Sequence, residues 1–147
     1  MTPSPPGWPR ISPAIYYDNA SEAIDWLCRA FGFVVRIRVV GENGKIQHSE
    51  LTFGEGLIMV SEADRGEKYP YRRSPGEISG GNTQNLLVYV DDVETHIQRA
   101  RDAGATIITD LETHDYGEEY WADRGYECVD LGGHHWWFYQ RLRSAVT

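Results

Sequence analysis

Cysteine is scarce in this 147-residue sequence, which contains only Cys28 and Cys128. Two cysteines do not make a disulfide framework, so we expect a protein of a reducing compartment. Long apolar runs are also missing, since no window approaches the roughly 20 apolar residues that a membrane-spanning helix needs. The first ten residues, MTPSPPGWPR, contain no apolar stretch of signal-peptide length and are expected to form a loose, proline-rich lead-in. We therefore expect a cytoplasmic protein without a membrane partner.

Positive charge is in short supply as well. The sequence has 14 Lys and Arg against 22 Asp and Glu, a formal net charge of −8 and a pI of about 5.0. Nucleic-acid binding needs a basic surface that displaces counterions, so no nucleic-acid partner is expected. A negative net charge tolerates a neutral or cationic ligand. With 41% hydrophobic and 12% aromatic residues, residues 1–147 are expected to form a single globular domain.

The common catalytic motifs are absent from the sequence. It contains no P-loop, dinucleotide-binding fingerprint, CxxC pair, HExxH helix or nucleophile elbow. The glycines stand at expected turns, and the serines have no triad context. No cofactor is therefore predicted.

What the sequence does contain is an internal repeat. The stretch ISPAIYYDNASEAIDWLCRAFGF predicts a strand and then a helix, with helical spacing of apolar residues and a stop at Gly32. Three further strands are predicted from VVRIRVV, KIQHSELTF and GLIMVSE, separated by the turn signals ENG and GEG. The first unit is therefore a βαβββ arrangement over residues 10–62.

The same order of elements recurs from Gln84. QNLLVYVDDVETHIQRARDAGA predicts a strand and a helix that stops at Gly104, and ATIITDL, YWADRGYECVDL and HHWWFYQ predict three strands. Residues 84–142 form the second unit. The polar residues 63–83, rich in Gly, Pro and Arg, are predicted to be a linker or a flap over a site. Superposing the two copies pairs Ser12 with Asn85 and Met59 with Trp137.

The paired units resemble the vicinal-oxygen-chelate superfamily of glyoxalases, bleomycin-resistance proteins and extradiol dioxygenases, and IQHSELTFGEGLIMVSE is similar to its PhnB-like branch. The resemblance implies an α+β fold in which two βαβββ repeats form paired curved sheets around a cup-shaped site. It also implies a homodimer, made either by pairing whole chains or by exchanging units between chains.

Metal-dependent members of that superfamily take ligands from the first and last strands of each unit. Carried onto this sequence, those positions are Ser12, Met59, Asn85 and Trp137. None suits Zn²⁺, Fe²⁺ or Mn²⁺, which prefer imidazole, carboxylate or thiolate ligands. Two neutral oxygens, one thioether and an indole N–H do not offset the dehydration of a divalent ion. No metal site is therefore predicted.

The last predicted strand sets which residues face the cup. Strand side chains alternate, so if Trp137 faces the cup then His135 and Tyr139 do too, while Trp136 and Phe138 pack on a helix. His134 is expected in a turn, pointing away. Trp137 is the predicted binding platform. The other predicted ligand-binding residues are Tyr16, Tyr89, His135, Asn85, Ser12, Met59 and Trp121.

His48 and Glu50 lie two apart on a predicted strand and share a face. They are weak candidates for a catalytic acid/base pair or for unconventional metal ligands, and the alternative is a hydrogen-bonded pair on a solvated sheet face. Ile46 and Leu51 fall on opposite sides of the alternation, which indicates either a bulge in this strand or a different register from the one assumed.

Two functions follow. The preferred hypothesis is a metal-free binding protein that sequesters a bulky aromatic or cationic compound such as an antibiotic. The alternative is a glyoxalase-like lyase or isomerase, or a dioxygenase, that uses His48 and Glu50 with His135. A third possibility is an interaction module without a small-molecule site.

Overall fold

The computed structural model describes residues 1–63 and 68–146. Residues 64–67 of the predicted linker lie outside the described residues. The chain divides into two compact units, Met1–Gly80 and Gly81–Thr147, called unit 1 and unit 2 below. Within the described residues, no helix is long and apolar enough to cross a bilayer.

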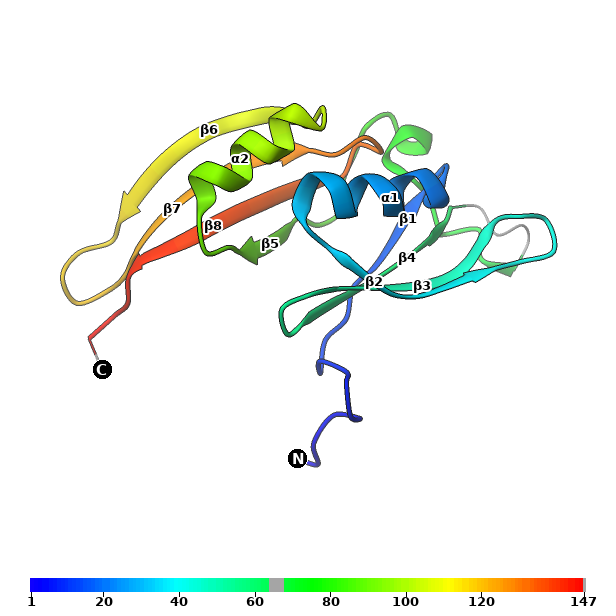
Figure 1. Ribbon diagram of the computed structural model, residues 1–147, viewed down its shortest axis with the longest axis horizontal. Helices are drawn as coiled ribbons and strands as arrows, with labels where there is room; N and C mark the ends of the chain where they lie inside the picture. The colour runs from blue at the N-terminus through cyan, green and yellow to red at the C-terminus, as the bar shows by residue number, and fades with distance from the viewer. Residues whose placement is uncertain (64–67, 147) are drawn as a thin grey trace. The chain divides into compact units, whose positions relative to one another are not determined.

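Unit 1 has one helix against one curved four-stranded sheet of order β1-β4-β3-β2 (Figure 1). β1 runs parallel to β4, and the other neighbours are antiparallel. A short 3-10 helix, η2 (Pro75–Ile78), follows the sheet. The main elements are β1 (Ala14–Tyr17), α1 (Ala20–Phe31), β2 (Val34–Val40), β3 (Ile46–Phe53) and β4 (Gly56–Glu62).

The residues on either side of helix α1 determine where it begins and ends. Asn19 caps the first turn, because its side-chain oxygen accepts a hydrogen bond from the Glu22 backbone N–H at 3.1 Å. Gly32 ends the helix with φ of 92°, a left-handed conformation that glycine adopts without a Cβ clash. Ile24, Leu27 and Phe31 are fully buried on the face toward the sheet.

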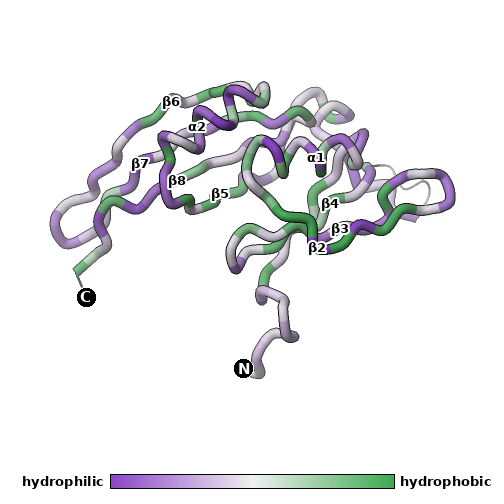
Figure 2. Tube along the Cα trace, in the orientation of Figure 1, coloured by the Kyte–Doolittle hydropathy of each residue, from purple (hydrophilic) through white to green (hydrophobic). Residues whose placement is uncertain are grey.

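Unit 2 repeats this plan with sheet order β5-β8-β7-β6 and a parallel β5–β8 pair. Asp92 caps its helix by accepting from the Thr95 backbone N–H at 3.1 Å. In Figure 2 the tip of the β6–β7 hairpin is coloured as hydrophilic. The elements are β5 (Leu86–Tyr89), α2 (Val93–Asp102), β6 (Thr106–Asp115), β7 (Ala122–Val129) and β8 (His135–Arg143).

Strand register confirms the repeat. Ala14 lies opposite Met59 in unit 1, and Leu87 lies opposite Trp137 in unit 2. These are the pairs that the superposition of Ser12 on Asn85 and of Met59 on Trp137 requires. The predicted α+β class with two βαβββ units is therefore confirmed.

Three boundaries differ from the sequence prediction. β1 starts at Ala14 rather than Ile11, because Pro13 directly precedes it and has no N–H for a sheet ladder. β6 continues to Asp115 and β8 to Arg143, beyond the predicted ends. The predicted bulge in β3 is present, as the β2–β3 register shifts between Val39 and Val40.

Candidate functional site

Each sheet has one face covered by its helix and one face turned away from it, called the open face below. In unit 2 the alternation along β8 buries Trp136 and Phe138, both 0% exposed, on the helix-covered face. Trp137 and Tyr139 therefore lie on the open face, together with their strand neighbours Leu87 and Tyr89. This is the alternation that the sequence predicts for the last strand.

The open face of unit 2 carries a row of aromatic rings. The centroids of Trp137 and Tyr139 are 5.7 Å apart and those of Tyr139 and Tyr89 are 6.4 Å apart, both in edge-to-face geometry. Gly125 on β7 makes room for the row, since an added Cβ there would lie 1.8 Å from a ring carbon of Tyr139. The row is a preformed apolar surface of the kind that binds flat ligands.

A polar clamp adjoins one end of the row. Asp123, which is 2% exposed, accepts hydrogen bonds from the Tyr89 hydroxyl at 3.1 Å and from Arg141 Nε at 2.6 Å. Arg141 also donates to the Tyr89 hydroxyl at 2.5 Å and lies over the rings of Tyr89 and Trp121. The clamp fixes the Tyr89 ring and raises the pKa of Arg141 through its bond to Asp123.

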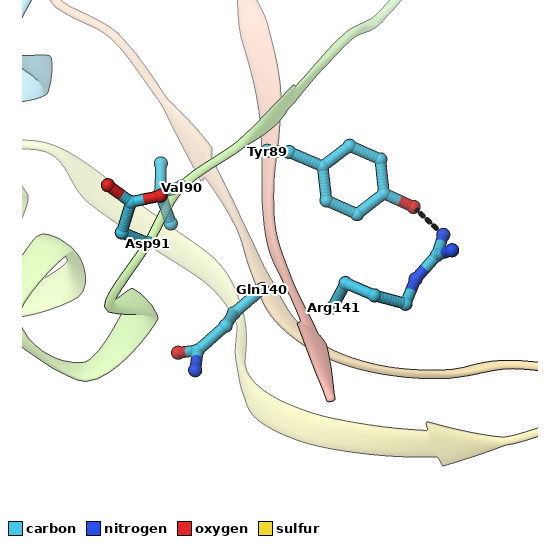
Figure 3. Close-up of a pocket in the computed structure, with 5 residues that line it drawn as sticks. All are labelled: Tyr89, Val90, Asp91, Gln140 and Arg141. Atoms are coloured by element: carbon cyan, nitrogen blue, oxygen red, sulfur yellow. Dashed lines mark hydrogen bonds between the residues drawn. The ribbon is translucent and has the colours of Figure 1, made fainter. Parts of the chain in front are cut away.

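A pocket of about 410 Å³ lies beside this clamp, at the end of the parallel β5–β8 pair. Figure 3 shows Tyr89 and Arg141 pointing to one side of it, with Asp91 and Gln140 on the other. Sequence reasoning missed Arg141, because the last strand was expected to end at Gln140. The alternation through Trp137 and Tyr139 would have placed Arg141 on the same face. The lining residues are Tyr89, Val90, Asp91, Gln140 and Arg141.

At the other end of the row, a carboxylate and a histidine form a pair. Glu127 on β7 lies opposite Trp137, and its Oε1 is 2.8 Å from His135 Nδ1. The Glu127 side chain is only 15% exposed and that of His135 is 29% exposed. Thr109 donates a long hydrogen bond of 3.5 Å to the second Glu127 oxygen. His135 and the predicted platform Trp137 therefore both lie next to Glu127, a carboxylate that the sequence prediction does not include.

The open face of unit 1 holds the His48–Glu50 pair, with His48 Nε2 2.7 Å from Glu50. Arg36 also binds Glu50, with Nε at 2.8 Å and Nη2 at 2.7 Å from the same oxygen. The bonds from His48 and Arg36 hold the pKa of Glu50 below its ordinary value of 4.5. A carboxylate that is so stabilised in its ionised form is a weaker general base, which disfavours the catalytic alternative.

The N-terminal segment contacts this same face. Arg36 lies 4.9 Å from the centre of the Trp8 ring and donates to the Gly7 carbonyl. The prediction of a loose lead-in is therefore wrong for Gly7 and Trp8, because a cation–π contact and a hydrogen bond attach them to β2.

The remaining candidates in unit 1 are Ser12, Met59 and Tyr16. Ser12 precedes β1, and its buried Oγ has no hydrogen-bond partner within the part of the chain that the structure describes. The Met59 backbone N–H donates to the carbonyl of Pro13, the residue after Ser12, at 2.8 Å, which brings the segment before β1 close to Met59 on β4. Tyr16 lies under the guanidinium of Arg72 at 5.3 Å. In unit 2, Asn85 is exposed and immediately precedes β5.

The metal site of the resembling superfamily does not fit these positions. Trp137 offers no lone pair to a cation, and its hydrophobic ring takes the space of a ligand side chain. Met59 is a soft thioether, and its neighbour Glu50 is already bound to Arg36. Across residues 1–63 and 68–146, no three His, Cys, Asp or Glu side chains gather as a ligand set.

Several known proteins resemble this chain in sequence or in fold. The chain is 33% identical to an uncharacterized protein of Mycobacterium tuberculosis strain H37Rv over 137 residues, which is 93% of this chain and 77% of that protein. The crystal structure of TioX from Micromonospora sp. ML1 is 31% identical, with a TM-score of 0.67 over 95% of this chain and 98% of TioX. TnmS3, an antibiotic binding protein from Streptomyces sp. CB03234, has a TM-score of 0.64 over 88% of this chain and 93% of TnmS3. Its identity is only 14%, so that likeness shows the fold alone.

A family model matches most of the sequence. Residues 11–138 fit the model of the Glyoxalase/Bleomycin resistance protein/Dioxygenase superfamily. That span includes the first βαβββ unit and the second as far as Phe138 in β8. The chain belongs to the glyoxalase/bleomycin resistance protein/dioxygenase superfamily.

Proposed function

We propose that this protein binds a bulky aromatic small molecule on the open face of unit 2 and acts by sequestering it, without a metal ion. The observation that carries the proposal is the row formed by Trp137, Tyr139 and Tyr89. These rings stay at least partly exposed, whereas the rings on the other face of the same strand are completely buried. An aromatic surface that the fold keeps out of its core is available to a ligand.

The rings are also held in place before a ligand arrives. Tyr139 rests on Gly125, and Tyr89 is fixed by Asp123 and Arg141. A preorganised wall lowers the entropy that a ligand must offset when it binds. The antibiotic-binding description of TnmS3 supports the same class of ligand, through the shared fold only.

The test is a titration with 9-aminoacridine, a planar aromatic probe whose own fluorescence anisotropy reports binding. We expect saturable binding by the full chain. Trp137→Leu removes the largest ring of the row and should weaken binding about tenfold, which corresponds to about 1.4 kcal/mol.

Trp8→Leu is the matched control, because Trp8 is also a partly exposed indole but lies on unit 1. It should leave the affinity within twofold of the parent protein. Equal losses in both variants, or no saturable binding by the parent, would show that the aromatic row of unit 2 is not the binding surface.

A further inference from the structure

The two units place a glutamate at the same point of the repeat. Glu50 lies opposite Met59, and Glu127 lies opposite Trp137. Met59 and Trp137 are themselves equivalent in the repeat, so each open face has one carboxylate beside the same repeat position of its last strand. Both side chains are mostly buried, with 12% of Glu50 and 15% of Glu127 exposed.

The two carboxylates differ in what balances their charge. Glu50 is bound by Arg36, a permanent cation, whose guanidinium lies over Trp8. Within the described chain, the only ionisable partner bound to Glu127 is His135, and a histidine balances a carboxylate only when it is protonated. No arginine or lysine among the described residues is paired with Glu127, so this carboxylate, unlike Glu50, has no permanent cation of the protein beside it.

Other carboxylates on the open face of unit 2 add to the negative charge around Glu127. The open face of unit 2 also carries Asp123, which Arg141 neutralises at 2.6 Å. Glu112 lies opposite Gly125 on the same face, and its partner His114 at 3.4 Å is again a titratable imidazole. That face therefore has three carboxylates against one guanidinium, on a chain whose net charge is −8.

Aromatic faces complete the environment. Trp137 lies directly across from Glu127, and Tyr139 follows two residues along the same strand. The face of an indole or phenol ring attracts a cation through its quadrupole, and a partly buried carboxylate strengthens that attraction where water is limited. A compact organic ammonium group satisfies both the rings and the carboxylate.

We infer that Glu127, with Trp137 and Tyr139, binds the ammonium group of an organic cation, so that the ligand is an aromatic amine or quaternary ammonium compound rather than a neutral or anionic one. This inference rests on the proposed binding function of the same face. It distinguishes the two units: the carboxylate of unit 1 is paired with the protein's own arginine, whereas that of unit 2 contacts only a histidine and a threonine and can also pair with a cationic ligand.

The experiment compares two probes of equal shape by isothermal titration calorimetry with the full chain. (3-Hydroxyphenyl)trimethylammonium is the cation, and 3-tert-butylphenol is its uncharged counterpart. The parent protein should bind the cation at least tenfold more tightly. Glu127→Gln should reduce the affinity for the cation about tenfold, leave the affinity for the phenol unchanged and so abolish the preference.

Glu50→Gln is the matched control, since it changes the equivalent residue of unit 1 and should alter neither affinity by more than twofold. Thermal unfolding of each variant shows whether it is folded. If Glu127→Gln is not, Trp137→Leu provides a second test: it should weaken binding of the cation more than binding of the phenol, because only the cation loses a cation–π contact.

The outcomes separate this inference from the proposed function. Equal binding of both probes, with no effect of Glu127→Gln, would overturn the cation site while leaving an aromatic binding face. An equal loss from Glu50→Gln would also overturn it, because the site would not be specific to unit 2. Failure of 9-aminoacridine and of both phenol probes to bind would instead refute the proposed function itself.

Discussion

The ring of Tyr139 lies across Gly125 on the neighbouring strand, so closely that residue 125 has no room for a side chain. Glycine is usually unfavourable inside a strand, because it has no side chain to pack and loses more conformational entropy. Here the ring of Tyr139 fills the space that a side chain at position 125 would occupy. The pair links the packing of β7 to the shape of the aromatic row.

Gly125→Ala should therefore destabilise unit 2 and displace Tyr139. An added methyl group at such a crowded position costs about 1–3 kcal/mol of unfolding free energy. Urea unfolding measures the loss. Combining it with Tyr139→Ala should recover part of that cost, so strictly additive losses in the double variant would show that the two residues do not touch.

Glu50 should make stability depend on pH in the acid range. Because its pKa is lowered by His48 and Arg36, the ionised carboxylate stabilises the folded state above the ordinary value of 4.5. That stabilisation is lost as the pH falls through the lowered pKa of the folded protein. Glu50→Gln, whose amide resembles the protonated acid, should be less stable than the parent at pH 7, and the difference in stability should shrink as the pH falls below 4.5. Urea midpoints from pH 3 to 7 test this, and a constant difference over that range would contradict it.

Asp130 holds the turn before β8. Its Oδ1 accepts from the backbone N–H groups of Gly132 and His134, at 2.9 and 3.0 Å, and its Oδ2 accepts from Trp136 Nε1 at 2.9 Å. Asp130→Ala leaves the buried indole N–H without this acceptor and should cost about 1–3 kcal/mol. Thermal or urea unfolding gives the value.

Asp110→Ala provides the comparison, as Asp110 forms an exposed ion pair with Arg101. Water and salt screen such exposed pairs, so Asp110→Ala should change the free energy of unfolding much less than Asp130→Ala does. If the two alanine variants lost equal stability, the turn would not depend on the Asp130 hydrogen bonds.

The two thiols should differ in reactivity. Burial, together with the nearby carboxylates of Asp130 and Glu127, raises the pKa of Cys128 to about 12. Its thiolate is therefore scarce at pH 8, and the side chain is inaccessible. In a Cys28→Ser variant, a thiol reagent such as DTNB should react only after urea is added, whereas rapid reaction of the native variant would show that Cys128 is exposed.

Local sequence patterns predicted most of the fold. Helix caps, glycine stops and strand alternation depend on neighbouring residues, so Asn19, Gly32 and the parity of Trp136 and Trp137 follow from the sequence. The strand register could be predicted because the repeat supplies a second copy of the same pattern.

The chemistry of the candidate site was less predictable. His135 was selected from its parity, but its partner Glu127 comes from the preceding strand, and only the β7–β8 register identifies it. Arg36 neutralises Glu50 and contacts Trp8, which lies 28 residues earlier in the chain in a segment without periodicity. Contacts of this kind depend on tertiary packing and leave no signal in local spacing.

The parallel pairing of β1 with β4 and of β5 with β8 joins the first and last strands of each unit. During synthesis, neither sheet can therefore be completed until the last strand of its unit has left the ribosome. Unit 1 has all its strands once Glu62 has emerged, while β5 waits for β8 at residues 135–143. Until then the apolar side of α2 has only part of its sheet to cover, so the nascent second unit exposes apolar surface until its last strand has been made.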